Sequence, residues 1–147
     1  MADSKTRFAA LPFRRSHGQW EVLLVTSRRS GRWIVPKGRP IKGCTAARTA
    51  KIEAFEEAGV SGAISRRSIG VFEMKSRFAR PRTKASRIEV FPLAVSRQHE
   101  SWQEESLRSR RWMTIGQAMK TVHPEGLCDL LAVFGQQLRR RRAAAKA

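Results

Sequence analysis

The sequence predicts an α/β protein in which strands precede and follow a first helix and further helices complete the chain. Short apolar runs separated by turn-forming residues are typical of strands. One segment begins with a residue that can cap a helix and ends at a glycine, as helices commonly do. Near the C-terminus, leucines recur at the spacing of one buried helical face. Together these three observations indicate a mixed α/β fold.

The first strands are predicted to form a hairpin. Residues 8–13 and 22–26 are apolar runs separated by a polar segment that contains a glycine, and residues 33–35 add a short third strand. Pro36 and Pro40 then exclude a helix from the loop that follows, because proline lacks the backbone N–H that a helix interior requires.

The first helix is predicted from Thr45, a suitable N-cap, to about Ala58, with Gly59 ending it. Its alanines form a stripe of small residues, which allows the helix to approach a sheet closely. Beyond it, residues 64–72 and 88–95 are predicted to form longer strands. Pro92 within the second of these is expected at a bulge or a sheet edge.

Residues 112–114 predict a last strand, followed by helices over 115–120 and from 125 to about 139. The second of these helices carries a buried face made by Leu127, Leu130, Leu131 and Phe134. The chain has 147 residues, of which 41% are hydrophobic, enough for one core and too few for two ordinary ones. We therefore expect a single domain over residues 1–138.

The terminal segment 139–147 is basic and has no apolar side chains to bury apart from alanines, so it predicts a frayed or disordered tail. It carries only a small share of the formal net charge of +18, and the body of the domain is basic as well. A cationic surface attracts any polyanion. Phosphorylated small molecules are therefore expected partners, with non-specific binding of nucleic acid through the basic surface and tail.

Other composition features bear on location. No apolar run has the length of a membrane span, and the first residues lack the apolar stretch of a signal peptide. Cys44 and Cys128 lie far apart without metal-type spacing, which is typical of free thiols in a reducing compartment. A cytoplasmic protein without a membrane partner is expected.

Three carboxylates follow a loop that is rich in glycine and carries lysines. Glu53, Glu56 and Glu57 fall within an arc of roughly 100° on an α-helix, so they are predicted to converge. Converging carboxylates repel unless a cation lies between them, and their hard oxygen atoms suit Mg²⁺ or Mn²⁺. On spacing alone, however, such a cluster is usually a solvated acidic face.

The surrounding residues decide between these interpretations. They resemble the Nudix box, G-x(5)-E-x(7)-R-E-U-x-E-E-x-G-U with U aliphatic. Gly38 takes the position of the first glycine, and Gly59 that of the last. Glu53 follows the arginine position, and Glu56 and Glu57 are the paired acids.

Two positions depart from the pattern. Cys44 stands where the box has its first glutamate, and Ile52 stands where it has arginine. The arginine of the family holds a neighbouring glutamate in place, and isoleucine cannot form that ion pair. The departures predict lowered activity.

The resemblance extends beyond the box. Residues 31–43 are similar to the lead-in of the diphosphoinositol polyphosphate phosphohydrolase branch and its bacterial relatives. Segments at 73–91, 102–104 and 111–114 follow in the order and approximate spacing of that branch, so the resemblance covers about residues 8–135. It implies an α/β/α sandwich with a mixed sheet, and hydrolysis of a pyrophosphate linkage that depends on Mg²⁺ or Mn²⁺.

The resemblance also implies site roles. Glu53, Glu56 and Glu57 are the catalytic acids and, with the backbone carbonyl of Gly38, the metal ligands; Glu53 would orient or deprotonate the attacking water. Glu104 could supply a further carboxylate from outside the helix, although an ordinary surface acid is the alternative.

Basic residues near the box and from facing loops are the candidates for substrate binding. A run over residues 75–87, which includes Arg77, contains no acid. Arginine can bind a phosphate through two hydrogen bonds, whereas lysine acts as a point charge. A substrate with many phosphates fits best, with diphosphoinositol polyphosphates first and dinucleoside polyphosphates second. The candidates are Arg32, Lys37, Arg39, Lys42, Arg82, Lys84, Arg87 and Arg108.

Two alternatives stay open. The positive charge also suits an RNA 5′-end pyrophosphohydrolase. Cys44 and Ile52 favour a catalytically weak Nudix-fold module that binds nucleic acid or another polyanion. Retention of three clustered glutamates favours the hydrolase, because a site without a metal gains nothing from holding three acids together.

Overall fold

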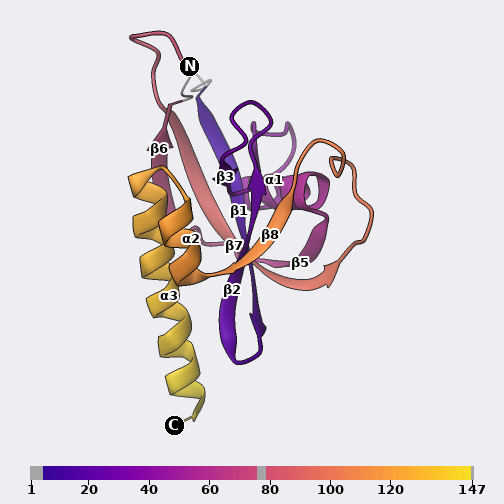
Figure 1. The fold of residues 1–147 in the computed structure, drawn as a ribbon, viewed down its shortest axis with the longest axis vertical. Coiled ribbons are helices and arrows are strands. Elements are labelled where there is room, and N and C mark those ends of the chain that lie inside the picture. Colours follow the sequence, from indigo (N-terminus) through magenta and orange to yellow (C-terminus); the bar gives the residue numbers. More distant parts are fainter. Residues whose placement is uncertain (1–4, 76–78, 147) are drawn as a thin grey trace.

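A computed structural model of the chain describes residues 5–75 and 79–146. A mixed eight-stranded sheet lies between the first helix on one face and the last two helices on the other (Figure 1). The predicted α/β/α sandwich with a mixed sheet is confirmed. Among the described residues, no helix has the length and apolar character needed to cross a membrane.

The sheet is built around two long strands that pair in parallel, β1 and β7. Its central order is β3-β2-β1-β7-β5, with β4 on β1, β8 on β2 and β6 on β7 as additional antiparallel pairs. The predicted hairpin is the antiparallel pair of β1 and β2. The strands are β1 (Thr6–Ser16), β2 (Gln19–Thr26), β3 (Trp33–Ile34), β4 (Lys37–Gly38), β5 (Val60–Ile64), β6 (Gly70–Met74), β7 (Ser86–Gln98) and β8 (Arg110–Thr114).

The prediction of one strand over residues 64–72 is wrong. β5 ends at Ile64 and β6 begins at Gly70, and both pair with the same long strand β7. The backbone N–H of Ser65 donates to the carbonyl of Pro92 at 2.9 Å. Because the N–H and C=O of a strand residue point to the same side, the missing N–H of Pro92 falls at this break. An internal strand therefore accommodates a proline where its neighbouring strand is interrupted.

The helix of the acidic segment is α-helical only in its first half. α1 (Ala46–Glu53) begins at Thr45, whose side chain accepts a hydrogen bond from the Arg48 N–H. It continues directly as a π-helix, η1 (Ala54–Ala58), which ends at Gly59 with a left-handed φ of 66°. A short π-helical turn widens the helix locally and changes which side chains share a face.

The last two helices cover the other face of the sheet. α2 is Ile115–Thr121 and α3 is Glu125–Lys146. The predicted apolar face of α3 is buried at Leu127, Leu131 and Phe134, and it continues to Leu138. Beyond that residue the helix continues to Lys146, and arginine and alanine are strong helix formers that need no buried partner. Fraying of segment 139–147 stays a prediction.

Candidate active site

The first glycine of the acidic segment is required by a close approach. Gly38 ends β4, and a Cβ atom at this position would overlap the carboxyl group of Glu53. The last residue of α1 therefore packs its side chain directly against the β4 backbone. Glycine at position 38 creates the space for that carboxylate.

Glu57 lies at the centre of a hydrogen-bonded network and is 5% exposed. Its Oε2 accepts a hydrogen bond from the backbone N–H of Lys37 at 3.1 Å, and its Oε1 pairs with Nη2 of Arg108 at 3.2 Å. The π-helical turn of η1 places this glutamate, which the sequence predicts to face a metal, against the sheet.

Arg108 uses all three guanidinium nitrogens inside the protein. Besides Glu57, Nε donates to Glu104 at 2.9 Å and Nη1 donates to the carbonyl of Thr26 at 3.0 Å. Only 13% of its side chain is exposed. Arg108, a predicted substrate-binding residue, is thus held within the acid network, and Glu104 is held there with it.

The end of the π-helix is fixed by an aromatic ring and a second arginine. Nε1 of Trp102 donates to the carbonyl of Glu57 at 3.0 Å. Arg110 stacks 3.7 Å from the centre of that ring and donates to the carbonyls of Ala58 at 2.9 Å and His99 at 2.7 Å. A Cβ at Gly59 would lie within 2.7 Å of the Arg110 guanidinium. Gly59 therefore serves both the left-handed turn and this contact.

Two of the carboxyls are shifted in their ionisation. Burial raises the pKa of Glu53 to about 7, and the nearby carboxylates of Glu56 and Glu104 add to the rise. Burial also raises the pKa of Glu57 to about 7, against the opposing effect of Arg108 and of the Lys37 N–H. The positive charge of Arg108 therefore does not offset the effect of burial on the ionisation of Glu53 and Glu57.

Convergence of the three carboxylates on one metal stays a prediction. Within residues 5–75 and 79–146, no three His, Cys, Asp or Glu side chains form a ready group for a metal. Glu57 pairs with Arg108, and the half-buried side chain of Glu56 forms no hydrogen bond with any described residue. The carboxylate oxygens of Glu53, Glu56 and Glu57 fit a hard cation.

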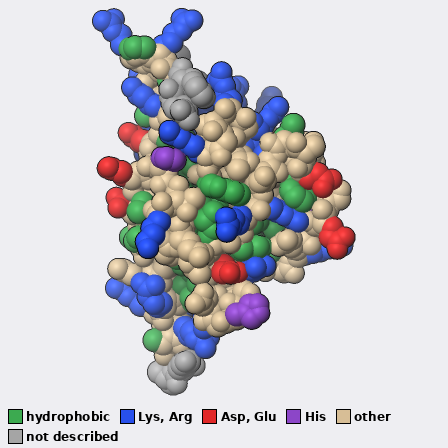
Figure 2. Space-filling view, in the orientation of Figure 1, with side chains coloured by type: hydrophobic (Ala, Val, Ile, Leu, Met, Phe, Trp, Pro, Cys, Tyr) green, Lys and Arg blue, Asp and Glu red, His purple; other side chains and the backbone are tan. Residues whose placement is uncertain are grey.

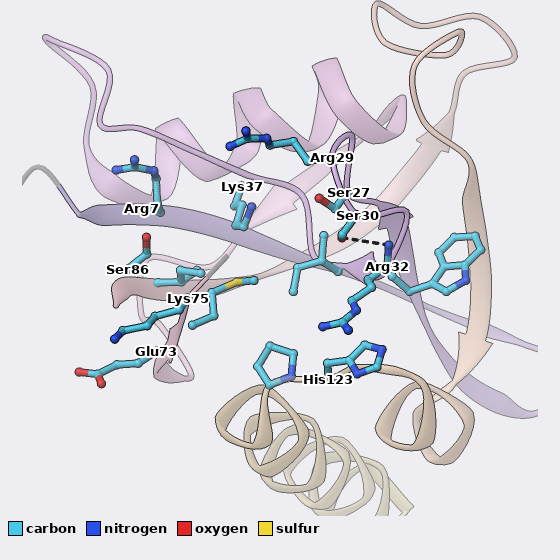
Figure 3. A pocket seen from close by; sticks show the side chains of 15 residues that line it. Arg7, Ser27, Arg29, Ser30, Arg32, Lys37, Glu73, Lys75, Ser86 and His123 are labelled. Carbon is cyan, nitrogen blue, oxygen red and sulfur yellow. Dashed lines mark hydrogen bonds between the residues drawn. The ribbon is translucent and has the colours of Figure 1, made fainter. Parts of the chain in front are cut away.

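A cavity of about 550 Å³ adjoins this network and is rich in basic side chains. Figure 3 shows these side chains around one space, carried by several different elements. His123 lies in the short segment that precedes α3. Lys37 belongs to both features: its backbone binds Glu57 and its side chain lines the cavity. Burial lowers the pKa of Lys37. The basic lining residues are Arg7, Arg29, Arg32, Lys37, Lys75 and His123.

Apart from Arg108, which is held in the acid network, the predicted substrate-binding residues divide into two groups. Arg32 and Lys37 line the cavity. The others are exposed and lie outside its lining: Arg39, Lys42, Arg82 and Lys84 in loops, and Arg87 on β7. Arg77 lies outside the described residues.

Four of the basic lining residues were not among the named candidates, although Lys75 belongs to the basic run over residues 75–87. Arg7 and Ala9 lie on one face of β1, and Ala9 pairs with Lys37 of β4, so strand alternation brings Arg7 to the Lys37 side. That signal depends on knowing the pairing of β1 with β4. Arg29 and Lys75 belong to basic segments without a periodic pattern. His123 is a single histidine before α3 and belongs to no motif. The cavity is therefore a product of the strand order.

The comparison with family models identifies residues 4–132 as a NUDIX domain. This chain belongs to the Nudix family. It is 31% identical over 128 residues to Nudix hydrolase 21, chloroplastic, of Arabidopsis thaliana, covering 84% of this chain and 63% of that protein. It is 38% identical over 121 residues to diphosphoinositol polyphosphate phosphohydrolase 3-alpha of Mus musculus, covering 80% and 69%.

Solved structures agree with the fold. The C. elegans Ap4A hydrolase superposes with a TM-score of 0.73 at 18% identity, covering 92% of this chain and 99% of that one. The NUDIX domain of Shewanella oneidensis NrtR, complexed with ADP ribose, superposes with a TM-score of 0.67 at 21% identity, covering 96% and 90%. The chain spans less than two thirds of the length of the two Arabidopsis Nudix hydrolases that it matches at 31% and 32% identity.

The Nudix box of this chain lacks its arginine, and the structure supplies another one. Ile52 cannot hold a glutamate of the box, whereas Arg108 reaches Glu57 from 51 residues further along the chain. Cys44 precedes the helix cap and lies outside the acid network. The box has lost its arginine in sequence, but Arg108, on the loop before β8, places a guanidinium beside Glu57.

Proposed function

We propose that this Nudix chain is a pyrophosphohydrolase that cleaves a phosphoric anhydride in a highly phosphorylated substrate and depends on Mg²⁺ or Mn²⁺. One observation carries the proposal: the acidic network and a strongly basic cavity meet at a single residue, Lys37. Acids that can hold a metal and cations that can bind phosphates are the two requirements of this reaction. In this chain the acids and the basic cavity lie next to each other, joined by Lys37.

The metal would be held by Glu53, Glu56 and Glu57 with the backbone carbonyl of Gly38, and would neutralise phosphoryl charge and activate water. Glu53, whose pKa is raised to about 7, is suited to accept the proton of the attacking water near neutral pH. Glu57 is fixed by two hydrogen bonds and orients the site. Glu104 acts through Arg108 as a positioning residue.

The cavity favours a substrate with several phosphates. Arg7, Arg29, Arg32, Lys37 and Lys75 line it, against one acid, Glu73. This excess of cations suits a diphosphoinositol polyphosphate, and relatives of that name are 36 to 38% identical to the chain over 121 residues. Trp33 is one of the lining residues, and an aromatic side chain there keeps dinucleoside polyphosphates as the second candidate.

One observation favours a different function, that of a catalytically weak binding module. Arg108 already neutralises Glu57, so this glutamate is less available to a cation. In that case the basic cavity would bind a polyanion, including the 5′ end of RNA, without turning it over.

The test is hydrolysis of a panel of diphosphoinositol polyphosphates, dinucleoside polyphosphates and 5′-triphosphorylated RNA in Mg²⁺ or Mn²⁺. The double variant Glu56→Gln, Glu57→Gln should lower the rate by about 10³-fold, in the range expected for loss of acid–base and metal-binding groups. The double variant Glu100→Gln, Glu105→Gln changes the net charge equally at two exposed positions and should keep full activity.

If the wild type forms product from one substrate class and the Glu56→Gln, Glu57→Gln variant does not, the chain is a hydrolase and that class is its substrate. Equal rates in both double variants would show that the box acids do not catalyse. Binding of the panel without any product would establish the binding module.

A further inference from the structure

A second cavity, of about 420 Å³, lies at the opposite end of the molecule from the proposed active site. It is bounded by the β1–β2 hairpin, the first residues of α2 and the last turns of α3. Arg7 lines the first cavity, and Arg15 lines the second eight positions further along β1. In an extended strand this is a distance of about 26 Å. The two cavities are therefore separate sites.

The end of α3 creates this cavity. Phe134 packs against Phe13 of the hairpin with ring centres 5.1 Å apart, and Leu138 is the last buried residue of the helix. The next residue, Arg139, and Arg142 one turn after Leu138 both line the cavity. In Figure 1, α3 runs alongside the hairpin and finishes beyond it. A stripe that is apolar over the sheet thus becomes cationic at its rim.

The cavity carries positive charge that no acid relieves. Three arginines line it, and none of the other lining residues is acidic. Arg139 and Arg142 form no ion pair or hydrogen bond with any residue in the described part of the chain. Arg15 donates to the carbonyl of Gly18 at 2.8 Å and lies 5.1 Å from the centre of the Trp20 ring. Figure 2 shows Lys and Arg side chains gathered at this end of the molecule.

The shape limits what can bind. The hairpin, α2 and α3 border the space, which is open to solvent above Gly116, where an added Cβ would meet no atom within 4 Å. A nucleic-acid strand needs a continuous groove with open aromatic faces for its bases. Here Trp20 is half-buried and partly covered by Arg15. A compact anion fits this geometry better than a strand.

We propose that this cavity is a second anion site, which binds a short linear polyphosphate through Arg15, Arg139 and Arg142. Guanidinium groups bind phosphate oxygens through paired hydrogen bonds, and unpaired arginines lose little by exchanging water for phosphate. The polyphosphate can be free or part of a nucleoside polyphosphate. The site requires neither the metal nor the box acids, so it stands whether or not the chain is a hydrolase.

The test uses the arginine pairs of α3. Arg139→Glu, Arg142→Glu reverses the charge at the cavity, and Arg140→Glu, Arg141→Glu makes the same charge change on the same helix outside its lining. All four positions are exposed and follow the last buried residue, so neither variant disturbs the core. Circular dichroism of both variants checks that the helix is retained.

Binding of inorganic tripolyphosphate is measured by titration calorimetry with EDTA at about 0.15 M salt, where the Debye length is about 8 Å and general attraction is screened. The full chain should show two sites. The Arg139→Glu, Arg142→Glu variant should lose one of them or bind at least tenfold more weakly, whereas Arg140→Glu, Arg141→Glu should keep both. ATP should bind the site with similar affinity, because its triphosphate makes the contacts.

Three results would overturn the proposal. Equal weakening by the two variants would show general charge attraction. A single tripolyphosphate site that neither variant alters would leave only the first cavity. Binding of a 5′-phosphorylated oligonucleotide without binding of tripolyphosphate or ATP would show a nucleic-acid surface instead.

Discussion

The two ends of the molecule use arginine in opposite ways. Near the box, Arg108 and Arg110 are fixed by carboxylates, backbone carbonyls and a tryptophan ring. At the hairpin end, Arg139 and Arg142 extend from a helix past its last buried residue and have no partner among the described residues. The same side chain thus positions protein groups at one end and remains available to an external anion at the other.

This contrast shows why net charge alone does not locate a site. A chain with 30 Lys and Arg residues attracts polyanions over much of its surface. Hydrolysis requires in addition that a group of acids lie beside a site that can bind phosphates, as where Lys37 joins the basic cavity to Glu57. The experiments below test whether the fixed arginines have the role that their contacts indicate.

Among the arginine variants, the largest effect is expected from Arg108→Ala. Glu57 would remain buried without its ion-pair partner, which is among the costliest changes in a protein. We expect kcat/KM to fall about 100-fold, equivalent to about 2.7 kcal/mol. Arg111→Ala, an exposed neighbour on β8, should change it less than twofold.

The box arginine provides the decisive comparison. If Arg108 replaces it, Ile52→Arg alone should raise the rate by less than threefold, and Ile52→Arg combined with Arg108→Ala should recover at least a tenth of the original activity. Steady-state kinetics with the preferred substrate measures all four proteins. A large gain from Ile52→Arg alone would contradict the compensation.

A smaller effect is expected in the first cavity. Arg32→Ala removes a cation that lines it, and loss of one charged hydrogen bond, about 1.5 kcal/mol, should raise KM about tenfold with little change in kcat. Arg39→Ala removes the same charge from an exposed position outside the lining. Equal KM values for the two variants would show that the cavity does not bind the substrate.

The smallest effect is on stability. The pKa of Glu57 is raised to about 7 from 4.5, so the folded chain holds this proton more tightly than the unfolded chain does. Its contribution to stability is present below pH 4.5 and is lost as the pH rises toward 7. In EDTA, the Tm of the wild type relative to Glu57→Gln should fall by a few degrees between pH 5 and 8.

Glu100→Gln, at an exposed position outside the network, serves as the control in the same thermal scans. Mg²⁺ should reduce the loss in the wild type, because a cation favours the ionised carboxylates. If Tm changes with pH in the same way for the wild type and Glu57→Gln, the pKa of Glu57 is not raised by burial in the folded chain.

Most elements could be predicted because their signals are local. The Thr45 cap, the Gly59 end and the spacing of Leu127, Leu131 and Phe134 each lie within a few residues of what they determine. The strands were missed at two places: β4 (Lys37–Gly38), which lies in a predicted loop, and residues 64–72. That segment is apolar enough for one strand, but its division into β5 and β6 depends on how both align with Pro92 of β7.

The sequence by itself determined the family, the position of the helix in the box and the glutamates that this helix carries, because the box is a contiguous pattern. The tertiary structure alone decided what surrounds them. It paired Glu57 with Arg108, and it placed Arg7 and Arg29, but not Arg39, in the lining of the first cavity. These contacts join segments that are distant along the chain, and no periodicity records which strands will be neighbours.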